Sequence, residues 1–176
     1  MIDRRTLLEA LVGLLFASSA LARAQSSPAK APVGPASEQS LAESPYVYVS
    51  PLRSNGEESR CHGEVWYGWI DGSVVVITAA RTWKARSLAR GLARARIWVG
   101  DYGRVKKMIG SNQAFRNGPS FLARAELVRD GALLDRLLEV YEKKYPAEIK
   151  NWRGPMRAGY RDGSRVLIRY VPDTRT

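Results

Sequence analysis

The sequence predicts a mainly β protein of the α+β class, a small and largely antiparallel barrel of about six strands with two attached helices. The first observation is a series of short segments rich in aromatic and β-branched residues, separated by turn signals such as Asp71-Gly72 and Asp162-Gly163. The second is that only two segments show clear helical spacing. The third is the absence of repeated strand–helix–strand units and of the GxGxxG and GxxxxGK(S/T) motifs, which argues against a doubly wound nucleotide-binding sheet.

The predicted strands are bounded by these turns. Residues 46–49 alternate Tyr and Val, and Pro51 ends the segment before a polar loop centred on Asn55-Gly56. Further strands are predicted over residues 63–70, 73–78, 94–99, 104–110, 120–128 and 164–171. Asp71-Gly72 is a strong signal for a two-residue hairpin, so we expect the first two of these strands to pair.

Two helices complete the predicted domain. A short helix covers residues 83–92, with arginine and lysine on its outer side. A longer helix covers residues 130–145, since Asp130 can cap its start and Pro146 ends it. Its leucines and tyrosines form an apolar stripe, which indicates a core or dimer face. Residues 149–156 fit neither the helical nor the strand pattern clearly.

The chain is strongly basic. Its 176 residues include 28 Lys and Arg against 17 Asp and Glu, a formal net charge of +11. Such a balance suggests an anionic partner, which could be a phosphorylated cofactor, a nucleic acid or an anionic membrane surface. The cations are spread along the whole chain without a run of five or six, so a soluble basic surface is the simpler interpretation and nucleic-acid binding is not expected.

The N-terminus has the pattern of an export signal. Arg4-Arg5 precedes an apolar stretch over residues 10–22, and Ala22-Arg23-Ala24 has the small-x-small form of a cleavage site. The paired arginines resemble a twin-arginine signal, a route for proteins that have already folded, often around a cofactor. We therefore expect a periplasmic or otherwise extracytoplasmic protein, with ordinary secretion as the alternative. The apolar stretch is too short for a convincing membrane span.

The predicted domain organisation follows from composition. Residues 1–24 form the signal peptide, residues 25–44 a flexible linker rich in Ser, Pro and Ala, and residues 45–172 the barrel domain. The single cysteine, Cys61, excludes an internal disulfide. Cys61 and the single histidine, His62, point to opposite faces of an extended chain, so neither a metal site nor a catalytic Cys–His pair is predicted.

One segment has the make-up of an anion site. The apolar run 74–77 ends in Thr78, and a short polar turn that holds Thr82, Lys84 and Arg86 then leads into the predicted short helix. Threonine hydroxyls and the free N–H groups of a helix start can donate hydrogen bonds, and Lys and Arg supply positive charge. A phosphate fits such a place.

The order of these elements resembles the FMN-binding split β-barrel proteins, the superfamily of pyridoxamine phosphate oxidase and the deazaflavin-dependent nitroreductases. The resemblance covers residues 46–171 and implies a six-stranded split barrel. In that family a strand ending in Ser or Thr runs into a Ser/Thr-x-Lys turn and a short helix, which together hold the flavin phosphate. Thr82-Trp83-Lys84 matches this turn, and Arg86 adds a second cation.

The resemblance further implies FMN, or alternatively a deazaflavin coenzyme, bound at the interface of a homodimer. It makes Thr78, Thr82, Trp83, Lys84 and Arg86 the candidate cofactor-binding residues, and Trp66 a candidate contact to the ring, although core packing is the simpler interpretation for the aromatic side chains. No catalytic side chain is assigned, because the chemistry of a flavoprotein belongs to its cofactor.

Three functions follow. The first is an exported flavin- or deazaflavin-dependent oxidoreductase of unknown substrate, supplied by an electron-transfer partner. The second is a non-enzymatic split-barrel protein that binds flavin, haem or another anionic ligand. The third is a basic protein that binds polyanions, for which clustered cations and exposed stacking aromatics would be expected.

Overall fold

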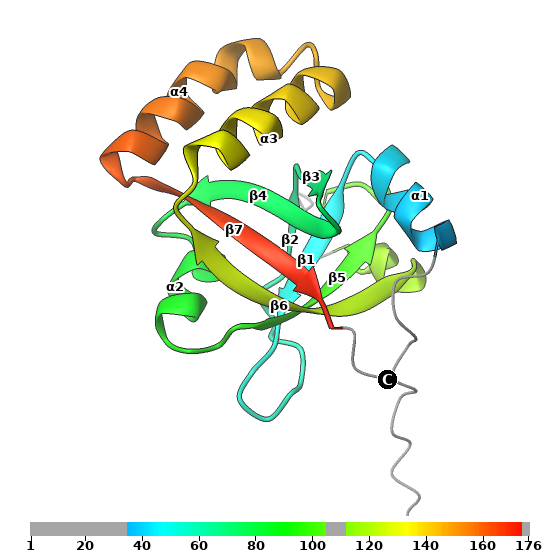
Figure 1. The fold of residues 1–176 in the computed structure, drawn as a ribbon. Coiled ribbons are helices and arrows are strands. Elements are labelled where there is room, and N and C mark those ends of the chain that lie inside the picture. Colours follow the sequence, from blue (N-terminus) through cyan, green and yellow to red (C-terminus); the bar gives the residue numbers. More distant parts are fainter. Residues whose placement is uncertain (1–34, 105–111, 174–176) are drawn as a thin grey trace, which may run out of the picture.

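The fold is a split β-barrel with helices packed on its outside (Figure 1), described by a computed structural model over residues 35–104 and 112–173. The described strands form one antiparallel sheet in the order β2-β1-β5-β6-β7-β4-β3. They are β1 (Val47–Pro51), β2 (Gly63–Val65), β3 (Gly68–Ile70), β4 (Ser73–Ala79), β5 (Arg94–Val99), β6 (Ser120–Val128) and β7 (Arg165–Pro172). The helices are α1 (Pro35–Glu43), α2 (Trp83–Ala89), α3 (Gly131–Lys144) and α4 (Ile149–Asp162), with a short 3-10 helix η1 (Ala114–Asn117).

The α+β barrel class is confirmed, but the strand count is seven and not six. One difference from the predicted strands lies at residues 63–70, where a single strand was predicted. The chain there forms β2 on one edge of the sheet and β3 on the other, joined only by Trp66 and Tyr67. Among the described strands β2 pairs with β1 alone and β3 with β4 alone. The split of the barrel is therefore closed by two residues of covalent chain and not by a hydrogen-bonded ladder.

The barrel interior is apolar. Alternate residues of the strands point inward, as expected for a strand with one face on a core. They include Val47, Val49, Val74, Val76, Ile97, Val99, Phe121, Ile168 and Tyr170, all buried. Leu41 of α1 and Ala85 of α2 join the same cluster, so these two helices contribute to the same core as the strands.

A second apolar cluster lies outside the barrel, where α3 and α4 run side by side over β3, β4 and β7 (Figure 1). Asp130 caps α3 as predicted, since its carboxylate accepts a hydrogen bond from the Leu133 N–H at 3.1 Å. Residues 149–156, which the sequence left open, form the first half of α4. Gly163, with φ +80°, ends α4 in the left-handed conformation that glycine adopts without strain.

Helix α1 lies inside the segment that the sequence analysis assigned to a flexible linker. Its Leu41 is fully buried, and the Tyr67 hydroxyl donates hydrogen bonds to the carbonyl oxygens of Leu41 and Ser44. The Lys144 ammonium donates to the same two carbonyls. Helix α1 is thus held on the barrel by the buried Leu41 side chain and by these hydrogen bonds to its backbone. The Ser- and Ala-rich composition of the segment did not predict a helix.

Two local predictions can be compared directly with the structure, and a third cannot. Asp71 and Gly72 have φ values of 49° and 68°, the positive values of the two-residue turn predicted between β3 and β4. Helix α2 ends earlier than predicted, near Gly91, whose φ is +77°. The strand predicted over 104–110 lies almost entirely outside the described residues. No helix in the described part of the chain has the length and apolar character needed to cross a membrane.

Candidate cofactor site beside the split

Thr78 and Thr82 form a pair of hydroxyls at the end of β4. Their Oγ1 atoms lie 3.3 Å apart, and either can be the donor. Thr78 is on the same face of β4 as Val76, which points into the barrel. Thr82 is the residue before α2, and its side chain makes no capping hydrogen bond to the helix. Apart from their mutual contact, neither hydroxyl has a hydrogen-bond partner among the described residues, so both can bind an oxygen-rich group.

Lys84 extends from the first turn of α2 toward the start of β2. Its Nζ atom would lie 3.2 Å from a Cβ built on Gly63, so the ammonium group lies against the bare backbone of that glycine. Burial lowers the pKa of Lys84, and the nearby Cys61 opposes this shift. None of the ion pairs formed by the described residues includes Lys84. The site therefore contains a half-buried cation that has no counter-ion in the described part of the chain.

Trp83 and Arg86 lie on the outer side of the same helix. The Trp83 side chain is 37% exposed, one of the few large apolar side chains in the described chain with such exposure. Arg86 is exposed in the last turn of α2. Both are exposed beside α2, where they could cover or neutralise a ligand.

Trp66 does not join this group. Its ring stacks on Tyr145 with centroids 4.4 Å apart, and it belongs to the outer cluster beneath α3. Ile77 lies in that cluster, whereas its neighbour Thr78 faces the other side of β4. The structure thus brings together Thr78 and Thr82, while Lys84 follows in the first turn of α2 with its ammonium against Gly63. Trp66 packs in the outer cluster, on the side of β4 that Ile77 faces and Thr78 does not.

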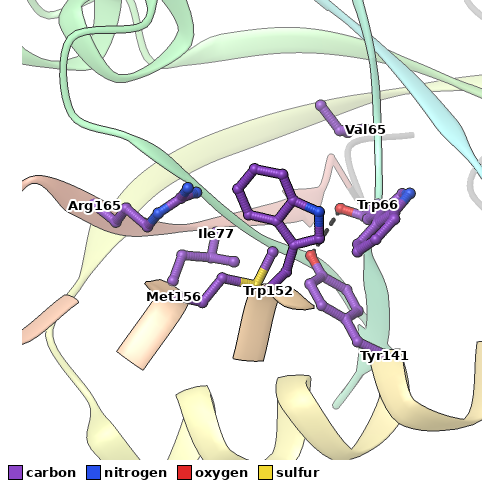
Figure 2. A pocket seen from close by; sticks show the side chains of 7 residues that line it. All are labelled: Val65, Trp66, Ile77, Tyr141, Trp152, Met156 and Arg165. Carbon is purple, nitrogen blue, oxygen red and sulfur yellow. Dashed lines mark hydrogen bonds between the residues drawn. The ribbon is translucent and has the colours of Figure 1, made fainter. Parts of the chain in front are cut away.

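A cavity of about 350 Å³ lies on that side of β4, between residues of α3, α4 and the barrel (Figure 2). Its wall includes Trp66, Ile77, Tyr141, Trp152, Met156 and Arg165. Of these residues the sequence analysis names Trp66, as a candidate contact to the flavin ring. Arg165 was missed, because its neighbours in the cavity come from helices whose packing the sequence pattern did not reveal.

No metal site accompanies these features in the part of the chain that the structure describes. The described residues contain no group of three or more His, Cys, Asp or Glu side chains close enough to hold an ion. Cys61 is exposed, and the His62 ring packs against Phe115 and contacts the Gln113 side chain at 3.0 Å.

Comparison with known proteins finds similarity in the fold and not in the sequence. No family model and no curated protein matches the sequence. Solved structures do match it, and the shared feature is the split β-barrel.

HutZ, the haem storage protein from Vibrio cholerae, is 14% identical, with 81% of this chain and 91% of that chain covered and a TM-score of 0.50. A conserved hypothetical protein from Mycobacterium tuberculosis is 22% identical, with 81% and 82% covered and a TM-score of 0.53. A putative pyridoxamine 5'-phosphate oxidase from Listeria innocua is 12% identical, with 77% and 90% covered and a TM-score of 0.47. At these identities the likeness concerns the fold alone.

Proposed function

We propose that this protein is a flavin-binding oxidoreductase that holds the phosphate of FMN, or of a deazaflavin coenzyme, at residues 78–88. The observation that carries the proposal is Lys84, a half-buried ammonium without an ion-pair partner among the described residues. An isolated buried cation is costly, and a bound phosphate would supply the missing charge. The adjacent Thr78 and Thr82 hydroxyls suit the same group.

These residues have distinct roles in the proposal. Thr78 and Thr82 donate hydrogen bonds to phosphate oxygens, and Lys84 neutralises their charge. Arg86 adds a solvent-exposed cation, and Trp83 shields one side of the ligand. When bound, the flavin supplies hydride or electron transfer, while the protein holds it and limits access of water.

The phosphate assignment is tested by comparing two ligands that differ only in that group. We expect the purified protein to bind FMN more tightly than riboflavin. Lys84→Met and Thr82→Val should each weaken FMN binding about tenfold or more, because a hydrogen bond to a charged group contributes about 1.5–3 kcal/mol. Neither change should affect riboflavin, so the preference for FMN should disappear.

Arg90→Met is the matched control, since Arg90 is an exposed cation at the other end of α2. It should leave the ratio of FMN to riboflavin affinity unchanged. Equal binding of FMN and riboflavin by the unmodified protein would overturn the phosphate site. A colourless protein that no flavin or deazaflavin reconstitutes would overturn the cofactor proposal as a whole.

A non-enzymatic binding protein is the second candidate, favoured by the fold shared with HutZ, which is described as a haem storage protein. The two candidates differ in turnover. An oxidoreductase reconstituted with FMN should oxidise a chemical or protein electron donor repeatedly when an electron acceptor is present. A storage protein should retain its ligand without turnover, and haem should compete with FMN for it.

Polyanion binding is the weakest candidate. The described residues form eight ion pairs, and the cation is an arginine in every one. Part of the positive charge on the folded domain is therefore compensated on its own surface, which leaves less for the phosphates of a nucleic acid.

The proposal includes export through a twin-arginine-like signal and assembly as a homodimer. Replacing Arg4 and Arg5 together by lysine should keep the protein in the cytoplasm, whereas Arg23→Lys, which leaves the arginine pair intact, should not. Unchanged export of the double variant would contradict this route. Light scattering on the purified protein should give twice the mass of one chain, and a monomer mass would contradict the dimer.

A further inference from the structure

We propose that the cavity under α4 is a binding site for a small, flat aromatic carboxylate, separate from the phosphate site at residues 78–88. We call it the Trp152 pocket. Its volume of about 350 Å³ lies in the range of small-molecule sites. It contains aromatic walls and a single cation, and these two features define the ligand class.

The first wall is rigid. The Trp66 ring is stacked on Tyr145 at 4.4 Å and meets Tyr141 edge-on, with centroids 5.8 Å apart. The Tyr141 hydroxyl donates a hydrogen bond to the Trp66 carbonyl at 2.8 Å, which holds this part of the chain in place. A ring held on one side by stacking can present its remaining edge and face to a ligand without first losing side-chain freedom.

The second wall is Trp152, which is 46% exposed although it lies on a helix whose Ile149 and Met156 are buried. Figure 2 shows its indole between Arg165 on one side and Trp66 on the other. An exposed tryptophan over a cavity is a large apolar surface that a planar ligand can cover. Core packing does not account for it, because nearly half of its surface is in solvent.

Arg165 supplies the charge. Its guanidinium carbon lies 5.6 Å from the centre of the Trp152 ring, and no ion pair of the described residues includes it. Gly159 of α4 leaves room for its stem, because an added Cβ there would lie 2.8 Å from the Arg165 Cγ and Cδ atoms. The close approach of α4 at Gly159 thus holds the Arg165 side chain at the rim of the aromatic cavity. Its guanidinium has no counter-ion among the described residues.

This combination selects among ligands. A guanidinium binds a planar carboxylate through two parallel hydrogen bonds, and the tryptophans favour a flat ring beside it. A sugar or another strongly polar molecule would find few partners, since the Tyr141 hydroxyl is already bonded to the Trp66 carbonyl. A neutral aromatic molecule would contact the rings but leave Arg165 unpaired.

Isothermal titration calorimetry on the purified full-length protein with 2-naphthoate and its neutral amide, 2-naphthamide, tests the site. We expect naphthoate to bind at least about tenfold more tightly than naphthamide, as one charged hydrogen-bonding contact would provide. Arg165→Met should remove this preference while naphthamide binding stays the same. Trp152→Ala should weaken both ligands about tenfold, since it removes a stacking surface.

Arg161→Met is the matched control, because Arg161 is an exposed cation of α4 outside the cavity wall. Should Arg165→Met not fold, Gly159→Ala displaces the same side chain without removing it and should also reduce the preference for naphthoate. Equal binding of the two ligands, no binding of either, or an identical effect of Arg161→Met would overturn the proposal. Displacement of naphthoate by FMN would assign the pocket to the flavin and overturn the separate site.

Discussion

The hydroxyl of Tyr141 donates a 2.8 Å hydrogen bond to the carbonyl oxygen of Trp66, from a helix outside the barrel to the two-residue link that closes its split. A backbone group at that link has no neighbouring strand to pair with, and an unpaired buried carbonyl is costly. The Tyr67 N–H in turn donates a 3.4 Å hydrogen bond to the hydroxyl oxygen of Tyr145, the residue that follows α3. Helix α3 thus replaces, with side chains, hydrogen bonds that a closed ladder would make.

Removing that hydroxyl should destabilise the fold. Tyr141→Phe leaves the Trp66 carbonyl without its partner, and we expect the free energy of unfolding to fall by about 1–3 kcal/mol in urea titrations. Tyr160→Phe is the control, because Tyr160 packs on the same apolar cluster, only partly buried. Equal losses in the two variants would contradict the role assigned to the hydrogen bond.

The turn between β3 and β4 depends on glycine at its second position. Gly72 has φ +68°, which any side chain makes unfavourable, although a Cβ there would meet no atom within 4 Å. Gly72→Ala should therefore cost about 1–2 kcal/mol of stability through backbone strain alone. Gly131→Ala, at the first residue of α3 with equally free space, should be neutral or slightly stabilising. A Gly72→Ala variant as stable as the parent protein would refute the strain argument.

Lys144 should make stability rise with pH in a defined window. Its ammonium lies 3.9 Å from the centre of the Tyr67 ring, and burial lowers its pKa from 10.5 to about 8. Between these values the unfolded chain binds a proton that the folded protein has released, so the free energy of unfolding increases as pH rises through the window. Below pH 8 both states are protonated and the penalty of burying the charge is complete.

Urea unfolding at about pH 7.5 and about pH 9.5 measures this effect. Lys144→Met should remove the part of the pH dependence that belongs to the buried ammonium. Lys143→Met, a change at the exposed neighbour on α3, should retain it. If the slope in Lys144→Met matched that of the parent protein, another group would have to be responsible.

The cap of α3 can be tested by itself. Asp130→Ala removes the acceptor of the Leu133 N–H and should lower the free energy of unfolding by about 1 kcal/mol. Glu139→Ala, on the exposed side of the same helix, should change it by less than about 0.5 kcal/mol. A chemical denaturation series on both variants distinguishes the cap from a general loss of negative charge.

The local elements were predictable because their signals are local. Asp71-Gly72 specifies a turn through the backbone angles that glycine and aspartate tolerate, and Asp130 specifies a helix start through a bond to a residue three positions away. The candidate phosphate residues also lie within one short segment. Thr78 and Thr82 are only four residues apart in the sequence, so their contact could be expected without knowledge of the tertiary structure.

Helix α4 and the Trp152 pocket were not predictable in this way. Gly154 and Pro155 both disfavour a helix interior, so the pattern over 149–156 stayed ambiguous, yet the helix forms with Ile149 and Met156 packed on the outer cluster. Packing on the barrel stabilises the helix although Gly154 and Pro155 disfavour it. Arg165 meets Trp152 only because that packing brings α4 to the start of β7.

By itself the sequence determined the α+β barrel class, the turn at Asp71-Gly72, the course of α3 and the segment that contains Thr78, Thr82 and Lys84. Only the tertiary structure decided that residues 63–70 divide between the two edges of the sheet, that α1 docks on the barrel, and that Trp66 faces away from Thr78. The physical reason is the range of the interactions. Turns and caps depend on neighbours in the chain, whereas strand pairing and helix docking depend on surfaces that exist only after the chain has folded.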